Sequence, residues 1–413
     1  MTELEKIGEG AKQAERTLMA ASTDKKNKAL SNIASEIDLN RDKWLKANAL
    51  DIENAKASGM SEALLDRLLL TDKRIDGIIK GIEEIIALDD PIGEVIETNI
   101  RPNGLKIEKR RVPLGVIAII YEARPNVTVD AAALTLKSGN AVILRGGKEA
   151  INSNKAVVEI MREALKKSDL PIESITLIED TSRESANELM HLTEYVDVLI
   201  PRGGKGLIRS VCANATVPVI RTGEGVCHVY IDKAADLEMG AKVLNNAKAS
   251  RPSVCNAAEC VLVHRDVLKD FLKVAEPILK TSKVTLHLDE EAMKYADGIS
   301  ATDADWDMEY GDYILAVKTV KDVNEAIDFI SQHGTGHSEA IITEDAKAAE
   351  EFLNRVDAAA VYLNASTRFT DGGEFGLGAE IGISTQKMHA RGPMGLKELS
   401  SYKYVVRGNG QVR

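Results

Sequence analysis

The chain has 413 residues, of which 44% are hydrophobic, and a formal net charge of −11. This length supports two or three domains with a sizeable core, and the acidic balance argues against general binding to nucleic acids or anionic membranes. No apolar run approaches the roughly 18 residues of a membrane span, and the first residues lack the charge pattern of a signal peptide. The four cysteines are too unevenly spaced for a disulfide framework or a zinc site, so we expect a reduced, cytoplasmic protein without a metal ion.

Residues 1–90 are predicted to be helical and residues 94–112 to form a hairpin. Isoleucines between Ile75 and Ile86 recur at helical spacing, which indicates a packing stripe. The hairpin is centred on Asn103-Gly104, a strong turn signal. It either projects and pairs with another subunit or is an ordinary solvated hairpin, and the residues alone leave both open.

From residue 113 onward, apolar strands alternate with helices. The predicted strands are 114–121, 141–144, 175–178, 196–200 and 217–220, and the predicted helices are 128–137, 152–167, 183–191 and 204–214. This alternation predicts a parallel sheet covered on both faces. Ligands of such sheets bind outside the carboxyl ends of the strands.

Two of these strand ends carry basic, glycine-rich turns. They are Arg145-Gly146-Gly147-Lys148 and Gly203-Gly204-Lys205, and the second opens a helix. Glycines let a phosphate approach backbone N–H groups, and a helix N-terminus adds a partial positive charge. Each turn alone could be a tight connection, and this half lacks the GxGxxG fingerprint. Two such turns on one sheet edge favour a phosphorylated nucleotide, so we predict that these residues bind the cofactor.

The second half alternates again, which predicts a second α/β domain. Its predicted strands are 261–264, 313–320, 340–342 and 359–363. Cys255 lies near its start, in a polar loop between a predicted helix at 236–249 and an apolar run. Loops commonly display reactive residues, and the nearby charge of Arg251 favours the nucleophilic thiolate.

A lone cysteine is more often a small buried apolar residue than a nucleophile. We interpret Cys260, Cys212 and Cys227 in that way, and Cys255 as the candidate nucleophile in a cleft between two domains. The segment 368–385 is rich in glycine and polar residues. It is either a long surface loop or a source of backbone donors for an anionic substrate, and loops of this length are usually functional.

The run from Arg251 to Glu259, Arg-Pro-Ser-Val-Cys-Asn-Ala-Ala-Glu, resembles the nucleophile loop of the gamma-glutamyl phosphate reductase family, a branch of the aldehyde dehydrogenase superfamily. Residues 121–130, 320–341 and 363–375 also resemble segments of this family, and the likeness covers nearly the whole chain. It departs at Phe329, where the family usually has histidine, so a catalytic role at this position is not expected.

The resemblance implies an α/β, aldehyde dehydrogenase-like fold with two parallel-sheet domains facing across a cleft and a projecting hairpin for oligomerisation. We expect a cofactor-binding domain at 1–93 and 113–227 and an oligomerisation arm at 94–112 with 400–413. The catalytic domain is expected at 228–367, and residues 368–399 form a glycine-rich return segment at the active site.

The resemblance also implies an activity, which is NADPH-dependent reduction of L-glutamate 5-phosphate to L-glutamate 5-semialdehyde and phosphate through a thioester at Cys255, the second step of proline biosynthesis. The amide of Asn126 would stabilise the oxyanion, and Glu309 would hold the nicotinamide ribose. The predicted substrate-binding residues are Arg124, Arg251, Ser366, Thr367, Arg368, Gly376 and Gly378. The expected partners are further copies of the chain, as a dimer or tetramer, and a separate glutamate 5-kinase.

Two alternatives to this interpretation are open from the sequence. The first is a semialdehyde dehydrogenase that oxidises to a free acid. Relatives of that kind carry a water-activating Glu in a Glu-Leu-Gly-Gly-Lys segment, where this chain has a displaced Glu224. The second is a binding protein without catalysis, against which the intact Cys255 loop argues.

NADPH is preferred over NADH because Arg145 and Lys148 suit a 2′-phosphate where many NAD-preferring relatives place a Glu.

Overall fold

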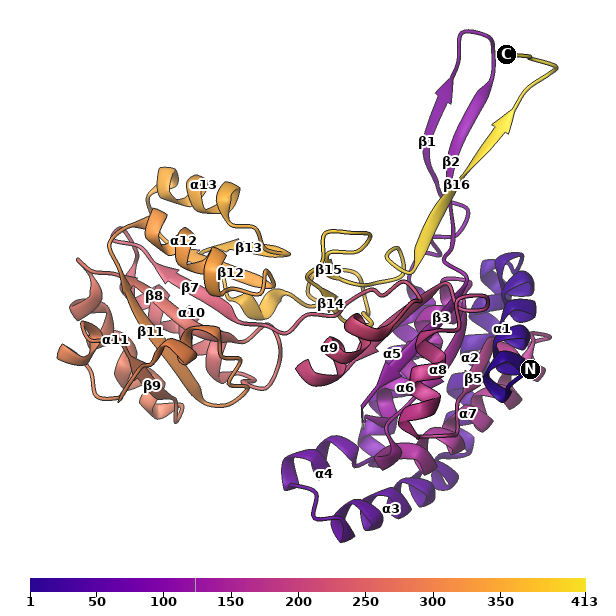
Figure 1. Cartoon of the computed structure of the whole chain (residues 1–413), viewed down its shortest axis with the longest axis horizontal. Helices are drawn as coiled ribbons and strands as arrows, with labels where there is room; N and C mark the ends of the chain where they lie inside the picture. The colour runs from indigo at the N-terminus through magenta and orange to yellow at the C-terminus, as the bar shows by residue number, and fades with distance from the viewer. Residues whose placement is uncertain (123) are drawn as a thin grey trace. The chain divides into compact units, whose positions relative to one another are not determined.

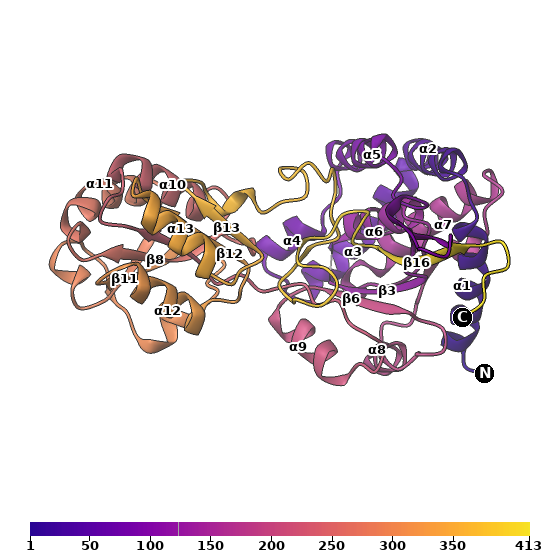
Figure 2. The same cartoon turned by 90° about the horizontal axis from the view of Figure 1, so that it is seen from above.

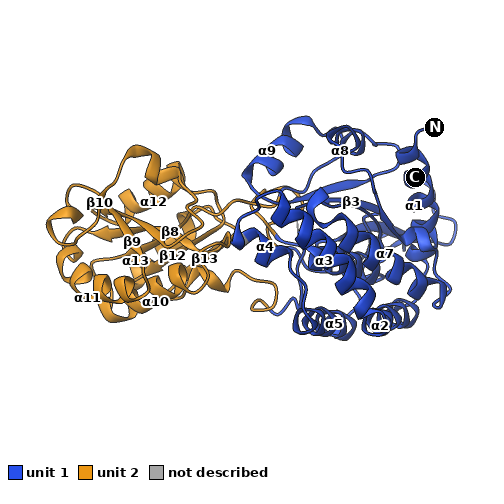
Figure 3. Cartoon of the chain, turned by 90° about the horizontal axis from the view of Figure 1, so that it is seen from below, with its two compact units in different colours: residues 1–221, 376–382, 394–413 blue, residues 222–375, 383–393 orange. Residues whose placement is uncertain are grey.

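The computed structural model describes residues 1–122 and 124–413, which form two compact units (Figures 1 and 3). Unit 1 comprises residues 1–221, 376–382 and 394–413, and unit 2 comprises residues 222–375 and 383–393. The first boundary falls a few residues before the expected one at 227. The glycine-rich segment 368–399 is divided between the two units.

Unit 1 combines amino-terminal helices, a parallel sheet and an antiparallel arm. Its helices are α1 (Glu3–Met19), α2 (Thr23–Leu39), α3 (Arg41–Ala57), α4 (Glu62–Leu68), α5 (Asp72–Ala87), α6 (Pro125–Lys137), α7 (Ile151–Lys166), α8 (Arg183–Met190) and α9 (Lys205–Asn214). Its strands are β1 (Val95–Ile100), β2 (Lys106–Pro113), β3 (Val116–Tyr121), β4 (Ala141–Arg145), β5 (Ile175–Leu177), β6 (Val198–Arg202) and β16 (Ser400–Arg407).

The parallel sheet of unit 1 has the order β5-β4-β3-β6. Every residue of β3 is buried, as its continuous apolar run requires of a strand covered on both faces. Figure 2 shows α8 and α9 on one face of this sheet and α6 with α7 on the other. The chain passes from β3 through β4 to β5 and then adds β6 on the other side of β3. The point where the strand order reverses therefore lies between β3 and β6.

The prediction of a strand at 217–220 was wrong. This segment runs beside β6, but only an isolated bridge joins Val219 to Leu199. Pro218 lacks a backbone N–H and restricts the residue before it, so the segment cannot extend the ladder.

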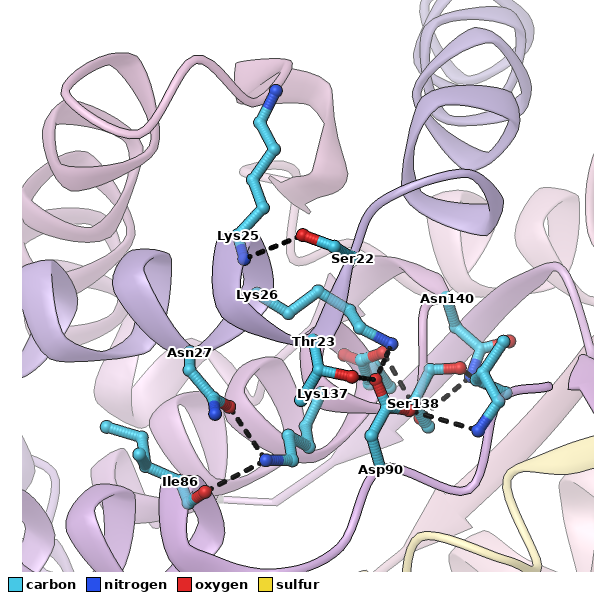
Figure 4. A network of polar contacts seen from close by, with 12 residues as sticks. Ser22, Thr23, Lys25, Lys26, Asn27, Ile86, Asp90, Lys137, Ser138 and Asn140 are labelled. Atoms are coloured by element: carbon cyan, nitrogen blue, oxygen red, sulfur yellow. Dashed lines mark hydrogen bonds and ion pairs between the residues drawn. The ribbon is translucent and has the colours of Figure 1, made fainter. Parts of the chain in front are cut away.

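A buried polar network attaches the amino-terminal helices to α6 (Figure 4). The ammonium of Lys26 on α2 lies 2.6 Å from the Asp90 carboxylate. The ammonium of Lys137, at the end of α6, donates to the Asn27 side chain at 2.7 Å and to the Ile86 carbonyl at 2.9 Å. Both lysines are almost completely buried, and burial lowers the pKa of Lys137. Because an unpaired buried charge is costly, this network holds α2, the end of α5 and α6 together.

The arm is a three-stranded antiparallel sheet in the order β1-β2-β16. The predicted hairpin turn is present, closed by a hydrogen bond from the Gly104 N–H to the Arg101 carbonyl at 2.8 Å. The carboxyl-terminal strand β16 pairs with the whole of β2, from Ser400 to Arg407. Figure 1 shows these strands extending away from the helices of unit 1.

Unit 2 is built on a second parallel sheet, of order β10-β9-β11-β8-β7-β12-β13. Its strands are β7 (Cys227–Ile231), β8 (Ala258–His264), β9 (Thr285–Leu288), β10 (Ile299–Ser300), β11 (Ile314–Val320), β12 (Ser338–Ile342) and β13 (Ala360–Leu363), with a small ladder of β14 (Ile383–Ser384) and β15 (Gly392–Pro393). Its helices are α10 (Leu237–Ala249), α11 (Leu268–Thr281), α12 (Val323–His333) and α13 (Ala346–Arg355).

Two apolar clusters lie on opposite faces of this sheet. One is formed with α10 and α11, and the other with α12 and α13. The strands β9 and β10 were not predicted because they are short and half polar. Among the described residues, no helix is long and apolar enough to cross a membrane.

Candidate active site

Cys255 lies on a β-turn at the amino end of β8. The turn is closed by a hydrogen bond from the Ala257 N–H to the Val254 carbonyl at 3.0 Å, so Cys255 is one of its two central residues. Helix α10 ends at Ala249, as the hydrophobic pattern predicts, and β8 begins at Ala258, three residues before the predicted strand at 261–264. The side chain is partly exposed, whereas Cys227 and Cys260 are buried. This turn is at the amino edge of its sheet, unlike the glycine-rich turns of unit 1.

Asn256, the next residue of the turn, anchors it to the segment after β13. Its amide donates to the Thr370 carbonyl at 3.0 Å and to the Arg368 carbonyl at 3.3 Å. Its backbone carbonyl accepts a hydrogen bond from the Thr367 hydroxyl at 2.7 Å. Residues 366–370 are therefore built against the turn that carries Cys255, and Asn256 makes the connection. The sequence alone does not indicate this role of Asn256, because a buried asparagine has no characteristic spacing.

Arg368 brings a positive charge to this turn. Its guanidinium donates to the Asn256 side-chain oxygen and, at 3.2 Å, to the Ser250 hydroxyl. Burial, together with the like charge of Arg251, lowers the pKa of Arg368, and the Cys255 thiol acts electrostatically in the opposite direction. Arginine stays protonated in proteins, so the turn has a permanent cation beside it. A nearby cation favours the thiolate of a cysteine.

The predicted substrate-binding residues are divided between the two units. Ser366, Thr367 and Arg368 lie against the turn that carries Cys255, and the exposed Arg251 belongs to the same loop. Gly376 and Gly378 instead belong to unit 1, where a side chain on Gly378 would collide with Leu88.

The glycine-rich segment also has fewer available donors than expected. The N–H groups of Gly373 and Glu374 donate to the Asp371 carboxylate, at 2.9 and 3.4 Å. Part of this segment therefore closes on itself.

A second set of predicted residues lies at the carboxyl edge of the unit 1 sheet. Gly147 and Lys148 follow β4, Gly203 to Lys205 follow β6, and Arg124 and Asn126 begin α6 after β3. This is the edge at which the strand order reverses, where open α/β sheets bind ligands. The amide of Asn126 donates to the Asp130 carboxylate at 3.0 Å, and burial raises the pKa of Asp130 to about 6.

Three of the predicted cofactor-binding residues already have structural partners. Arg145 donates to the carbonyls of Thr181 and Ser182, at 2.7 and 2.8 Å. Gly146 is buried, and a side chain there would meet Asn154 and Tyr121. The Gly204 N–H donates to the Glu122 carboxylate at 3.1 Å.

Lys148 is exposed at this edge, and so is Lys205 after β6, so both of these predicted cations reach the surface. The glycine-rich turns therefore serve partly to pack strands and helices closely, and their role in cofactor binding stays a prediction.

Glu309, which the resemblance assigned to the nicotinamide ribose, accepts a hydrogen bond from the Gly225 N–H at 3.1 Å. Gly225 itself lies against the carbonyl of Cys255. Glu309 thus supports the segment around Gly225, against which the cysteine turn of unit 2 packs. Its contact with a ribose stays a prediction. No group of three or more His, Cys, Asp or Glu residues in the described ranges is arranged to hold a metal ion.

The two-unit α/β fold, with a partly exposed cysteine on a turn before a central strand, is that of the aldehyde dehydrogenase class. The model of the aldehyde dehydrogenase family matches residues 1–312 and 297–405. An acetylating aldehyde dehydrogenase of Geobacillus thermoglucosidasius superposes with a TM-score of 0.71 at 18% identity, covering 100% of this chain and 97% of that one, which shows the shared fold.

Two nearer relatives are more specific. The gamma-glutamyl phosphate reductase of Clostridium beijerinckii is 58% identical over 414 residues, covering 100% of both chains. The crystal structure of the gamma-glutamyl phosphate reductase of Thermotoga maritima has a TM-score of 0.98 at 51% identity and also covers 100% of both chains. The chain therefore belongs to the aldehyde dehydrogenase family and, within it, to the gamma-glutamyl phosphate reductases.

Proposed function

We propose that this protein reduces L-glutamate 5-phosphate to L-glutamate 5-semialdehyde and phosphate with NADPH, the second step in making proline from glutamate. The observation that carries the proposal is the turn on which a partly exposed Cys255 lies beside the Arg368 cation. The full-length similarity to gamma-glutamyl phosphate reductases supports it. Because the substrate is an acyl phosphate, a kinase acting on the glutamate side chain must supply it, and we propose functional coupling to glutamate 5-kinase.

The first step is an acyl transfer to the protein. The Cys255 sulfur attacks the acyl carbon of the substrate, the bond from this carbon to the phosphate oxygen breaks, and a thioester remains. The Cys255 N–H and the Asn126 amide are the proposed donors to the oxyanion of the tetrahedral intermediate. Arg368 stabilises the attacking thiolate and keeps the turn attached to residues 366–370.

The second step releases the aldehyde. A reduced nicotinamide, when bound, supplies the hydride that reduces the thioester carbon. The Cys255 thiolate is then expelled from the resulting thiohemiacetal, which frees the aldehyde and restores the nucleophile. Cys255 therefore both accepts the acyl group and leaves, and the same cation can stabilise its thiolate at each stage.

The cofactor preference can be tested at Lys148. This side chain is exposed after β4, at the edge where the strand order reverses, and its charge suits a 2′-phosphate. We expect Lys148→Glu to raise the KM for NADPH by about 10- to 100-fold relative to NADH, because a carboxylate repels the phosphate that the ammonium attracts. Steady-state kinetics with both cofactors measures this ratio, with Lys155→Glu on α7 as the matched surface control. An unchanged ratio in Lys148→Glu would place the adenosine site elsewhere.

We also propose that the arm joins copies of the chain into a homo-oligomer, a dimer or a tetramer. Both of its outer strands present apolar side chains, among them Ile100, Tyr404 and Val406, which are 71%, 62% and 55% exposed. An unpaired strand edge with exposed apolar residues is a template for pairing with another chain. Light scattering should show a smaller particle for Tyr404→Asp with Val406→Asp than for the unaltered protein. An unchanged mass would remove the arm from the interface.

A further inference from the structure

The nucleophile turn rests on a segment of backbone that enters β7. A Cβ placed on Gly225 would lie 1.4 Å from the carbonyl oxygen of Cys255, so the two backbones touch at a distance that only glycine permits. Glu309 holds the Gly225 N–H, and the Thr335 hydroxyl holds the Val226 N–H, each at 3.1 Å. The segment is therefore anchored independently of the turn that lies on it.

Cys227, two residues further on, contacts the same carbonyl. Its sulfur lies 3.2 Å from the carbonyl oxygen of Cys255, within hydrogen-bond distance for a thiol donor. The side chain is completely buried, and burial raises the pKa of Cys227 well above the usual value for a thiol. Cys227 consequently keeps its proton over the working range of pH and can donate it throughout.

A second possible acceptor near this thiol is the His337 ring, which lies further from it than the carbonyl. The His337 Nδ1 lies 3.8 Å from the Cys227 sulfur but only 2.8 Å from the Ser338 hydroxyl. Burial lowers the pKa of His337 to about 4, so its ring is neutral. If Nδ1 bears the proton, it cannot accept one. If Nδ1 is bare, the nearer donor to it is the Ser338 hydroxyl, which also lies 2.6 Å from the Thr370 hydroxyl. In both tautomers the Cys255 carbonyl oxygen, 3.2 Å from the Cys227 sulfur, is a nearer acceptor for the thiol than Nδ1 at 3.8 Å.

The carbonyl that Cys227 contacts belongs to the central peptide of the turn from Val254 to Ala257. This peptide is the one that flips when a β-turn changes between type I and type II. The described non-glycine residues with positive φ are Asp169, Lys283, Asn364 and His389, so Asn256 has negative φ and the turn is not type II. Asparagine tolerates positive φ better than most residues, so the alternative orientation is accessible to this sequence.

We propose that Cys227 is a positioning residue whose thiol, by donating to the Cys255 carbonyl, holds the central peptide of the turn in the orientation that presents the Cys255 side chain for attack. The inference rests on the proposed role of Cys255 as nucleophile. It gives Cys227 a part in the reaction without contact to substrate or cofactor. From the sequence alone, Cys227 is interpreted only as a structural residue.

The test compares Cys227→Ala, which removes the donor, with Cys227→Ser, which keeps one. The first readout is the rate at which iodoacetamide alkylates Cys255, measured by peptide mass spectrometry in a Cys212→Ser background because Cys212 is exposed. Cys260→Ala, a buried cysteine of β8, is the matched control for loss of a core sulfur. We expect Cys227→Ala to slow alkylation about three- to tenfold, the effect of one lost hydrogen bond, and Cys227→Ser to stay near the unaltered rate.

The second readout is turnover, where kcat of Cys227→Ala should fall by the same factor while the KM values stay unchanged. The proposal would be overturned if Cys227→Ala and Cys260→Ala had equal rates of Cys255 alkylation. It would also be overturned if Cys227→Ser lowered this rate as much as Cys227→Ala does. Alkylation needs neither substrate nor cofactor, so the alkylation measurement tests the role of Cys227 even if the proposed reaction is not the one catalysed. If Cys227→Ala does not fold, Cys227→Thr and Cys227→Val form a pair of equal size that differs only in the donor.

Discussion

Replacing Cys255 with alanine should lower the rate of glutamate 5-phosphate reduction by roughly 10³-fold or more, the scale on which removal of a covalent nucleophile acts. The reason is that hydride transfer in the proposed mechanism occurs at a thioester carbon, which cannot form without the thiol. The side chain is partly exposed on a turn whose anchoring contacts come from Asn256 and from the backbone. Loss of the sulfur therefore leaves no large cavity, and the fold should remain stable.

The measurement is NADPH oxidation at saturating substrate, together with a thermal melt and a titration of cofactor binding. Cys260→Ala is the control, because Cys260 is buried in β8 and contacts the apolar core. We expect this control to retain activity. Cys255→Ala should melt near the temperature of the unaltered protein and still bind NADPH. Comparable turnover in Cys255→Ala would show that the acyl group is not carried by this cysteine.

In the reverse direction, oxidation of glutamate 5-semialdehyde should require inorganic phosphate or arsenate for sustained turnover. Without either, we expect at most one turnover per site, because the thioester then has no suitable acceptor. Water needs a positioned base, and general-base catalysis is typically worth about 10²–10⁴-fold. Phosphate needs no such base because it arrives as an anion. The expected ratio of steady rates with and without phosphate is therefore about 100-fold or more.

Glu224 is the residue at which the alternative, hydrolysis of the thioester by an activated water, can be tested. It is partly buried and directly precedes Gly225, which lies against the Cys255 carbonyl, so it is the carboxylate of this segment to examine first. NADP⁺ reduction is followed with glutamate 5-semialdehyde, with and without phosphate, in the unaltered protein and in Glu224→Gln. Steady phosphate-free production of glutamate that disappears in Glu224→Gln would move the protein to the acid-forming branch of its family. If the unaltered protein and Glu224→Gln require phosphate to the same degree, the result supports the proposed reductase reaction.

Much of the local structure was predictable from the sequence. Cys255 was predicted to lie in a connection between a helix that ends at Ala249 and an apolar run that follows Glu259. In the structure it lies between α10 and β8. The alternation of apolar strands and helices predicted two parallel sheets, and Asn103-Gly104 predicted the hairpin. These features depend on neighbours in the chain, whose periodicity and turn chemistry act over a few residues.

The contacts around Cys255 were decided by tertiary structure. Residues 367–370 meet Asn256 more than a hundred positions away in the chain, and Gly225 approaches Cys255 only because β7 pairs with β8. Arg145 and Gly146 are predicted cofactor-binding residues. In the fold, Arg145 donates to two backbone carbonyls, and the side chains of Asn154 and Tyr121 fill the space beside Gly146.

The sequence by itself determined the elements, their order and the residue chemistry that identifies the family. The tertiary structure decided which side chains remain available, because hydrogen-bond partners and close backbone contacts come from segments that are distant in sequence. Cys227 illustrates the difference. In the sequence it is a cysteine at the start of an apolar strand, and in the fold it donates to the backbone of the proposed nucleophile.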